Sequence, residues 1–409
     1  MAQRKKQQAQ TGATPSGKNG KLSVTQYTGI NATGTKTVLV SALLEVTGQV
    51  RFGDGTDIAT TITEKDTVLG PNGSVEKAVW AGTKRRGVDR RTIHEFRDRA
   101  GWDEGDCYIP KLCGMCPICW LFGFTGTTQE QDSAVKGINS KSRLLYATSL
   151  SIQDTAQCLN RHSRNQVDEK AQTTAGAAGI HEEEVIVGGT RFPVYTSLIH
   201  VLDWEVGAFA HALLENLNSN RYTAASRAQG GIKYVELDSA PAIIVDESAL
   251  GIFPFAAPKI PAWETDLAKT TEVFTQAKNS PPSLEPFRVA LQAQGFNVEA
   301  AANTLTAKGG DVELTVEVDG GCLVVHQGRD ELMKRYYGSQ AVGYLRQKQI
   351  EFQKKLSDSK WRANFKSEVR DYAQKLQGKA AERTTEVSGD ADTEAGTSGG
   401  SGGDGGASE

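Results

Sequence analysis

The chain has 409 residues, a net charge of −3 at pH 7 and 38% hydrophobic residues. This length predicts two or three domains, or one domain with large insertions. The sequence has no run of about 18 apolar residues, which excludes a helix that spans a membrane, and the low net charge excludes a uniformly basic protein. Six cysteines, four of them clustered, favour a reducing compartment over a disulfide framework, so we expect a cytoplasmic protein.

Both ends of the chain are polar. Residues 1–21 are basic, and residues 380–409 are rich in Gly, Ser, Asp and Glu. Neither segment carries enough apolar surface to offset the entropy that is lost when a chain becomes ordered. We therefore predict a disordered basic tail at the N-terminus and a disordered acidic tail at the C-terminus.

Residues 22–245 show the pattern of an α+β domain. The expected order is strand, helix, strand, strand, helix and strand, at residues 36–52, 84–99, 141–152, 190–202, 204–218 and just after residue 231. Asp203 precedes the second helix and is a candidate N-cap. This order is the split βαβ, or ferredoxin-like, arrangement, which RNA-recognition domains also use.

The part of the chain that follows is predicted to differ in structure. Residues 246–328 form an appended segment that is Pro-rich to about residue 286 and has short strands near residues 311–326. Residues 329–379 are predicted to be helical, because their apolar residues recur at roughly helical spacing. These residues are Leu332, Tyr336, Leu345, Phe352 and Leu356.

Four cysteines lie within thirteen residues, in the pattern C-x5-C-x2-C-x2-C. They are Cys107, Cys113, Cys116 and Cys119. Cysteines at this spacing predict a tetrahedral zinc site, and a site closed by four protein ligands is structural and not catalytic. Two alternatives remain open, namely buried or redox-active thiols, and a site in which a histidine from elsewhere replaces Cys107.

Two basic segments are candidate phosphate-binding sites. The first is the helix at 84–99, with Lys84, Arg85, Arg86, Arg90 and Arg91. The second is a glycine-containing loop with Arg221, Arg227, Gly230 and Gly231, since glycine lets a backbone approach a phosphate. The alternatives are a solvated helix face and an ordinary turn. The loop lacks a Walker lysine, which argues against nucleotide hydrolysis.

Asp54 and Asp57 lie in a glycine-containing stretch just after the first predicted strand. Their carboxylates could help to activate a 2′-hydroxyl group or hold a metal ion beside an RNA backbone. The alternative is turn chemistry, because Asp-Gly is a strong turn signal. No serine or cysteine nucleophile stands out beside a histidine.

Several segments together resemble the RAMP superfamily of CRISPR proteins. The segments CWLFGF (119–124) and INSKSRLLYATSLSIQD (138–154) resemble its LFG and SRL-x-(V/I)-x-D motifs, and EEEVIVGGTRFPVYTSL (182–198) resembles its E-x-V-x-x-G-T-x-F strand. RYTAASRAQGGIKYVEL (221–237) lies where the family has its Gly-rich loop, with a looser match. The length, the cysteine cluster and the C-terminal part are most similar to the backbone subunit of type I-D Cascade.

The resemblance implies a hand-shaped RNA-binding subunit. Its palm is the RNA-recognition fold, its fingers are the zinc-knuckle insertion at about 53–135, and its thumb is a hairpin at about 153–190. In that thumb Arg164, Asp168 and Thr174 approximately match positions of related subunits. The RNA-binding residues that the resemblance adds are Ser142, Arg143, Arg161 and Arg164.

The resemblance also implies the partners. Copies of the subunit stack along one CRISPR RNA (crRNA), beside other Cascade subunits, and target DNA, or target RNA, binds through the guide. Residues 246–328 would face that target. We expect an RNA-binding structural subunit and not an enzyme. One alternative is that it also cuts target RNA with Asp54 or Asp57, and another is that the chain is a zinc-containing RNA-binding module that acts alone.

Overall fold

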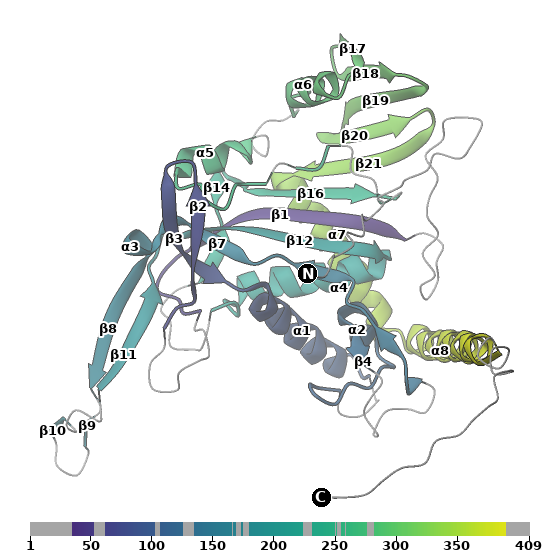
Figure 1. Cartoon of the computed structure of the whole chain (residues 1–409), viewed down its shortest axis with the longest axis horizontal. Coiled ribbons are helices and arrows are strands. Elements are labelled where there is room, and N and C mark those ends of the chain that lie inside the picture. The colour runs from purple at the N-terminus through teal and green to yellow at the C-terminus, as the bar shows by residue number, and fades with distance from the viewer. Residues whose placement is uncertain are drawn as a thin grey trace, which may run out of the picture. The chain divides into compact units, whose positions relative to one another are not determined.

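The computed structural model has an α+β fold (Figure 1). It describes residues 35–52, 62–102, 107–125, 135–165, 167–168, 173–174, 180–223, 231–249, 251, 255–257, 259–275 and 282–389. The chain divides into two compact units. The first comprises residues 1–103 and 142–359, and the second comprises residues 104–141 and 360–409. Within the described ranges, no helix is both long and apolar enough to cross a membrane.

A large antiparallel sheet forms the centre of the first unit (Figure 1). Its strands run in the order β17-β18-β19-β20-β21-β16-β1-β12-β6, and β13 pairs with one end of β1. They are β1 (Lys36–Val46), β6 (Leu144–Tyr146), β12 (Arg191–Val201), β13 (Ile232–Tyr234), β16 (Ile243–Ser248), β17 (Asn297–Ala301), β18 (Thr304–Gly309), β19 (Val312–Asp319), β20 (Cys322–Gln327) and β21 (Asp330–Tyr337).

The central strand β1 is buried along almost its whole length because both of its faces are covered. Val40, Ala42 and Leu44 face a group of aromatic and apolar side chains that includes Trp80 and Phe209. Leu43 lies in a second apolar cluster on the other face. A strand covered on both sides reads as a nearly continuous apolar run, which is what the segment VLVSALLEV shows.

Three helices of this unit pack in series. They are α1 (Gly82–Arg99), α4 (Asp203–Asn218) and α7 (Gly338–Ser357), and α4 contacts both of the others. Phe96, His211 and Phe352 contribute one ring from each helix to a shared contact. The backbones of α4 and α7 approach closely at Gly207, where any side chain would overlap the carbonyl of Lys348.

The appended segment builds the second apolar cluster. It adds the helices α5 (Leu267–Glu272) and α6 (Glu285–Ala293) to the strands β17–β21, and Phe274, Phe287 and Leu291 are buried there. The buried carboxylate of Asp246 on β16 accepts two hydrogen bonds from Arg335 on β21. This bidentate ion pair joins the added strands to the central ones.

Smaller sheets complete the first unit. One has three strands, β2 (Lys65–Gly70), β3 (Gly73–Trp80) and β7 (Ser149–Asp154). After the short helix α3 (Thr155–Cys158), β8 (Leu159–Asn165) pairs with β11 (Ile180–Ile186) in a hairpin that extends away from the large sheet (Figure 1). Two further two-stranded ladders are β9 (Val167–Asp168) with β10 (Thr173–Thr174), and β14 (Glu236–Leu237) with β15 (Ala240–Pro241).

The second unit contains the helix α2 (Pro117–Phe122), the strands β4 (Phe124–Thr125) and β5 (Asn139–Ser140), and the long helix α8 (Ser359–Gly389). Trp120 on α2 contacts Phe124 and Tyr372 edge-on, with ring centroids 5.2 and 5.5 Å apart. Aromatic packing therefore joins the segment around α2 to α8.

The structure corrects three details of the sequence analysis. Residues Asp330–Tyr337 form β21 and not a helix, because they pair with strands on both sides. The strand expected at 141–152 is two strands, β6 and β7, which belong to different sheets. Asp203 does not cap α4 but is its first residue, and it pairs with Lys348 at 2.8 Å. In addition, α8 extends past residue 380, where the acidic tail is predicted to begin.

Candidate metal centre and nucleic-acid interface

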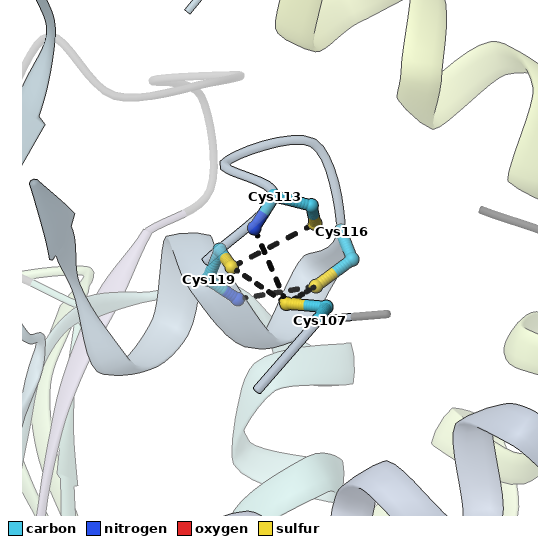
Figure 2. Close-up of side chains that lie close together, drawn as sticks. All are labelled: Cys107, Cys113, Cys116 and Cys119. Carbon is cyan, nitrogen blue, oxygen red and sulfur yellow. Dashed lines mark hydrogen bonds between the residues drawn. The ribbon is translucent and has the colours of Figure 1, made fainter. Parts of the chain in front are cut away.

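All four clustered cysteines converge on one point (Figure 2). The Sγ atom of Cys107 lies 3.3 Å from that of Cys119 and 3.7 Å from that of Cys116, and Cys113 Sγ lies 3.8 Å from Cys119 Sγ. All four sulfur atoms lie within 4.8 Å of one another. Cys107 is therefore a member of the cluster, as the spacing predicted.

Local structure holds these sulfur atoms in place. Cys116 is the N-cap of α2, and its sulfur accepts a hydrogen bond from the backbone N–H of Cys119 at 3.5 Å. Pro117 occupies the first turn of that helix, where its missing N–H leaves no donor unsatisfied. Gly114 has φ +68° and makes the turn between Cys113 and Cys116.

The geometry fits a tetrahedral dication. A metal–sulfur distance of about 2.3 Å gives a tetrahedron with edges of about 3.8 Å, close to the observed separations. Disulfide sulfurs lie only about 2.05 Å apart, so these are four separate thiols. Burial raises the pKa of the Cys116 thiol, whereas a bound dication would favour its thiolate. The cluster is thus compatible with a zinc site that leaves no position for substrate.

The cations of α1 differ in exposure. Arg91 is exposed, and Lys84 is partly exposed beside Glu64, 3.9 Å away. Arg85 is buried, its guanidinium lies over the rings of Trp80 and Tyr146, and it donates to the carbonyl of Ala147. Arg86 is partly buried and Arg90 is buried. The solvent-facing cations of this helix are therefore fewer than its sequence suggests.

The residues of the SRL segment make contacts within the fold. Arg143 donates to a carboxylate oxygen of Glu205 at 2.8 Å and to the carbonyl of His200 at 3.2 Å. Glu205 is fully buried, and that burial raises the pKa of its carboxyl. Ser142 donates to the carbonyl of Leu144 at 2.9 Å. Arg143 thus balances a buried charge.

The hairpin of β8 and β11 carries the two arginines predicted for the thumb. Arg161 is 69% exposed and pairs with Glu184 at 2.9 Å. Arg164 lies opposite His181 in the same ladder. Asp168 and Thr174 lie on β9 and β10, which pair with each other.

The glycine-containing loop is described at its two ends. Arg221 donates to Glu95 on α1 at 2.5 Å. Gly231 exchanges hydrogen bonds with Thr47 at the end of β1, and the side chain of Asn220 occupies the space that a Cβ on Gly231 would need. The candidates Arg227 and Gly230, like Asp54 and Asp57, lie outside the described residues.

The sequence analysis did not single out Asp89, a buried carboxylate on the basic helix α1. Asp89 lies on α1 and is 1% exposed, and three side chains from other parts of the fold donate to it. The available signal was one acidic residue flanked by arginines in the stretch KRRGVDRR. That pattern shows a single negative charge among positive ones, but it does not show which face of the helix is buried.

Comparisons with known proteins give a family match for part of the chain. The model of a family described as Csc2 Crispr matches residues 71–237, which include α1, the cysteine cluster, β6–β12 and α4. Curated proteins include no match to this chain.

Solved structures with some similarity include three from CRISPR systems. A chain of "Type IV-B CRISPR Complex" is 13% identical with a TM-score of 0.36, and covers 56% of this chain and 96% of its own. Csc2 from Thermofilum pendens is 16% identical with a TM-score of 0.42, at 84% and 91% coverage. A chain of the Csm3-Csm4 subcomplex of the type III-A interference complex is 13% identical with a TM-score of 0.28, at 53% and 81% coverage. Over residues 71–237, this chain is similar to the Csc2 CRISPR family.

Proposed function

We propose that the protein is a crRNA-binding backbone subunit of a CRISPR interference complex of the type I-D kind. The observation that carries this proposal is the Csc2 Crispr family match over residues 71–237. That range contains the segments in which the RAMP motifs appear in family order. Several copies would assemble head to tail along one guide, since a heterologous interface that does not close produces a filament.

The arrangement of the first unit supports this proposal. The neighbouring strands β16-β1-β12-β6 are all antiparallel. In chain order, β1 precedes α1 and β6 follows it, and both of these strands border β12. Likewise β12 precedes α4 and β16 follows it, and both border β1, as in the split βαβ fold. Such a sheet is the palm that we propose, and the hairpin of β8 and β11 is its thumb.

The proposed RNA contacts are the exposed cations around this palm. Arg91 and Arg161 are exposed, and Lys84 and Arg221 are partly exposed. Arg164, Arg227 and the Gly230–Gly231 pair are added to them from the sequence. Arg85 and Arg143 are left out because their guanidinium groups serve interior contacts. The cysteine cluster would hold a structural zinc in the fingers, and residues 246–328 would face the target that pairs with the guide.

Purification together with the neighbouring subunits tests the proposal. We expect this chain in stoichiometric excess, bound to a discrete small RNA, in a cytoplasmic complex. A particle with a single copy of the chain, or one without RNA, would refute it. A monomer that binds RNA tightly and forms no filament would instead support an independent zinc-containing RNA-binding module.

A second candidate activity is target-RNA cleavage by Asp54 or Asp57. The observation that favours it is the position of the described residues on either side of the segment that contains these aspartates. The backbone N–H of Thr63 donates to Glu184 at 3.1 Å, and that of Glu64 donates to the carbonyl of Phe52 at 3.4 Å. The segment therefore begins and ends near the base of the proposed thumb. Replacing both aspartates by alanine should abolish regular cutting of a guide-matched RNA, and unchanged cutting would exclude both from the mechanism.

A further inference from the structure

Glu184 on β11 is a buried carboxylate that accepts hydrogen bonds from two cations. Its Oε1 atom accepts from Lys65 Nζ at 3.0 Å and from Arg161 Nε at 2.9 Å. Its Oε2 atom accepts from the backbone N–H of Thr63 at 3.1 Å. Burial acts to raise the pKa of Glu184, but the hydrogen bonds from Lys65, Thr63 and Arg161 lower that pKa below its usual value. The carboxylate is therefore ionised at neutral pH and holds both cations.

The two cations come from different sheets. Arg161 lies on β8, directly opposite Glu184 in the ladder of the hairpin, and Lys65 begins β2 of the three-stranded sheet. Because both cationic nitrogen atoms contact the same oxygen atom, they lie within reach of one phosphate group. Two positive charges and one negative charge leave an excess of positive charge at this place.

Both cations keep donors for a ligand. Arg161 is 69% exposed, and among the described residues only its Nε atom finds a hydrogen-bond partner. An arginine that is anchored in this way presents the rest of its planar fork in one orientation, which suits the oxygen atoms of a phosphate. Lys65 is 25% exposed, and Glu184 takes only one of the three donors of its ammonium group.

The opposite face of the hairpin carries a different ion pair. Successive residues of a strand point to opposite faces, so Glu183 faces away from Glu184, and it pairs with Arg51. Beside it, Val50 and Ile186 exchange backbone hydrogen bonds of 3.0 and 2.8 Å. Glu183 and Glu184 are each 5% exposed. Glu183 therefore matches Glu184 in charge and burial but has another cation as its partner.

We propose that Lys65 and Arg161 form a binding site for one phosphate of the guide RNA, and that Glu184 is the positioning residue that holds them together. This inference rests on the proposed function and adds Lys65 to its RNA contacts. The carboxylate favours the binding of an anion because it orders two long side chains in advance, and the ordering of such side chains otherwise opposes binding.

The first test compares Glu184→Gln with Glu183→Gln on the full chain, with a single-stranded guide RNA as the probe. An amide has one acceptor oxygen and one NH2 donor, so at position 184 it cannot accept from Thr63 and from the two cations together. Loss of a negative charge by itself favours RNA binding. We nonetheless expect Glu184→Gln to weaken binding about tenfold, whereas Glu183→Gln should bind RNA as tightly as the wild type or more tightly.

The melting temperatures of these two variants should be similar, since each change removes one buried carboxylate from the same strand. Equal losses of RNA affinity in the two variants would reduce Glu184 to a stabilising role and overturn the inference. Unchanged or tighter binding by Glu184→Gln would overturn it as well.

The salt dependence of binding gives a second criterion. On a single strand, each neutralised phosphate contributes about 0.7 to the slope of log K against log salt concentration. A triple variant with Lys65→Gln, Arg161→Gln and Glu184→Gln removes the three charges together and leaves no carboxylate buried without its cations. Its slope should be shallower than that of the wild type by about 0.7, whereas Lys308→Gln, which removes an exposed lysine from β18, should keep the wild-type slope.

The outcomes separate this inference from the proposed function. A triple variant with the wild-type slope would exclude the site, and a loss of about 1.4 would mean that the two cations contact separate phosphates, which overturns the shared site. In both of these cases the wild-type chain still binds RNA and the proposed function stands. A wild-type chain that binds no guide RNA would refute the proposed function and this site with it.

Discussion

The buried carboxyl of Asp89 predicts a specific pH dependence of stability. Burial raises its pKa from 3.8 to about 6, against the hydrogen bonds from Tyr222, Tyr146 and Asn216 and the charge of Arg85, all of which favour the ionised form. The difference of about two units corresponds to about 3 kcal/mol. Because the folded pKa is the higher one, the native state binds the proton more tightly, and stability is lost as the pH rises from about 4 through 6.

Asp89→Asn removes this titration and keeps a hydrogen-bonding group of similar shape. The assay is urea unfolding of both chains between pH 4.5 and 7.5, followed by tryptophan fluorescence. Over that range the free energy of unfolding of the wild type should fall by about 2 kcal/mol relative to Asp89→Asn. Glu205, whose pKa is also raised by burial, is present in both chains and cancels in the difference.

Asp66→Asn is the control, since Asp66 is an exposed carboxylate on β2. Its unfolding free energy should follow the wild type at every pH. A difference between the wild type and Asp89→Asn that stays constant with pH would refute the reasoning. It would mean that the donors and Arg85 compensate the burial of the carboxylate completely.

Three further predictions concern packing, a buried ion pair and the metal. Gly207→Ala should lower the unfolding free energy by about 1–3 kcal/mol, because the added methyl group overlaps the facing helix. Gly343→Ala, which has open space around it, should raise the unfolding free energy by about 0.5–1 kcal/mol. Equal effects of the two changes in urea unfolding would contradict the close approach of the helices at Gly207. Arg335→Met leaves the carboxylate of Asp246 buried and unpaired and should cost about 3–5 kcal/mol, so a thermal melt unchanged from wild type would exclude this role for the ion pair. Elemental analysis should find about one zinc per chain in the wild type and clearly less in Cys116→Ser, whose melting temperature should also be lower. Wild-type protein that contains no metal when purified without chelator would contradict a zinc site.

The features that the sequence alone determined are local ones. The cysteine cluster is predictable because its four ligands lie within thirteen residues, and turns such as the one at Gly114 bring such ligands together without help from distant parts of the chain. The helices α1 and α4 were predicted to within two residues of their observed ends. The RAMP motifs are short, but their order along the chain is also a property of the sequence.

Tertiary structure decided which polar residues face inward. Arg85 and Arg91 belong to the same basic run, yet one stacks on buried aromatic rings and the other is exposed. Asp89 looked like one more charge on a solvated helix, and only the packing of β6 and α4 against α1 made it a shared acceptor. Burial and partners come from residues far away in the chain, so no local pattern records them.

The strand β21 shows that local sequence patterns can also fail to predict secondary structure. Its apolar residues at 332 and 336 fit a helical spacing, but strand pairing on both sides overrides that local preference. The sequence by itself thus specified the cysteine cluster, the main helices and the family resemblance. Tertiary structure alone decided which charges are buried and which strands pair, because burial and pairing depend on contacts between distant residues.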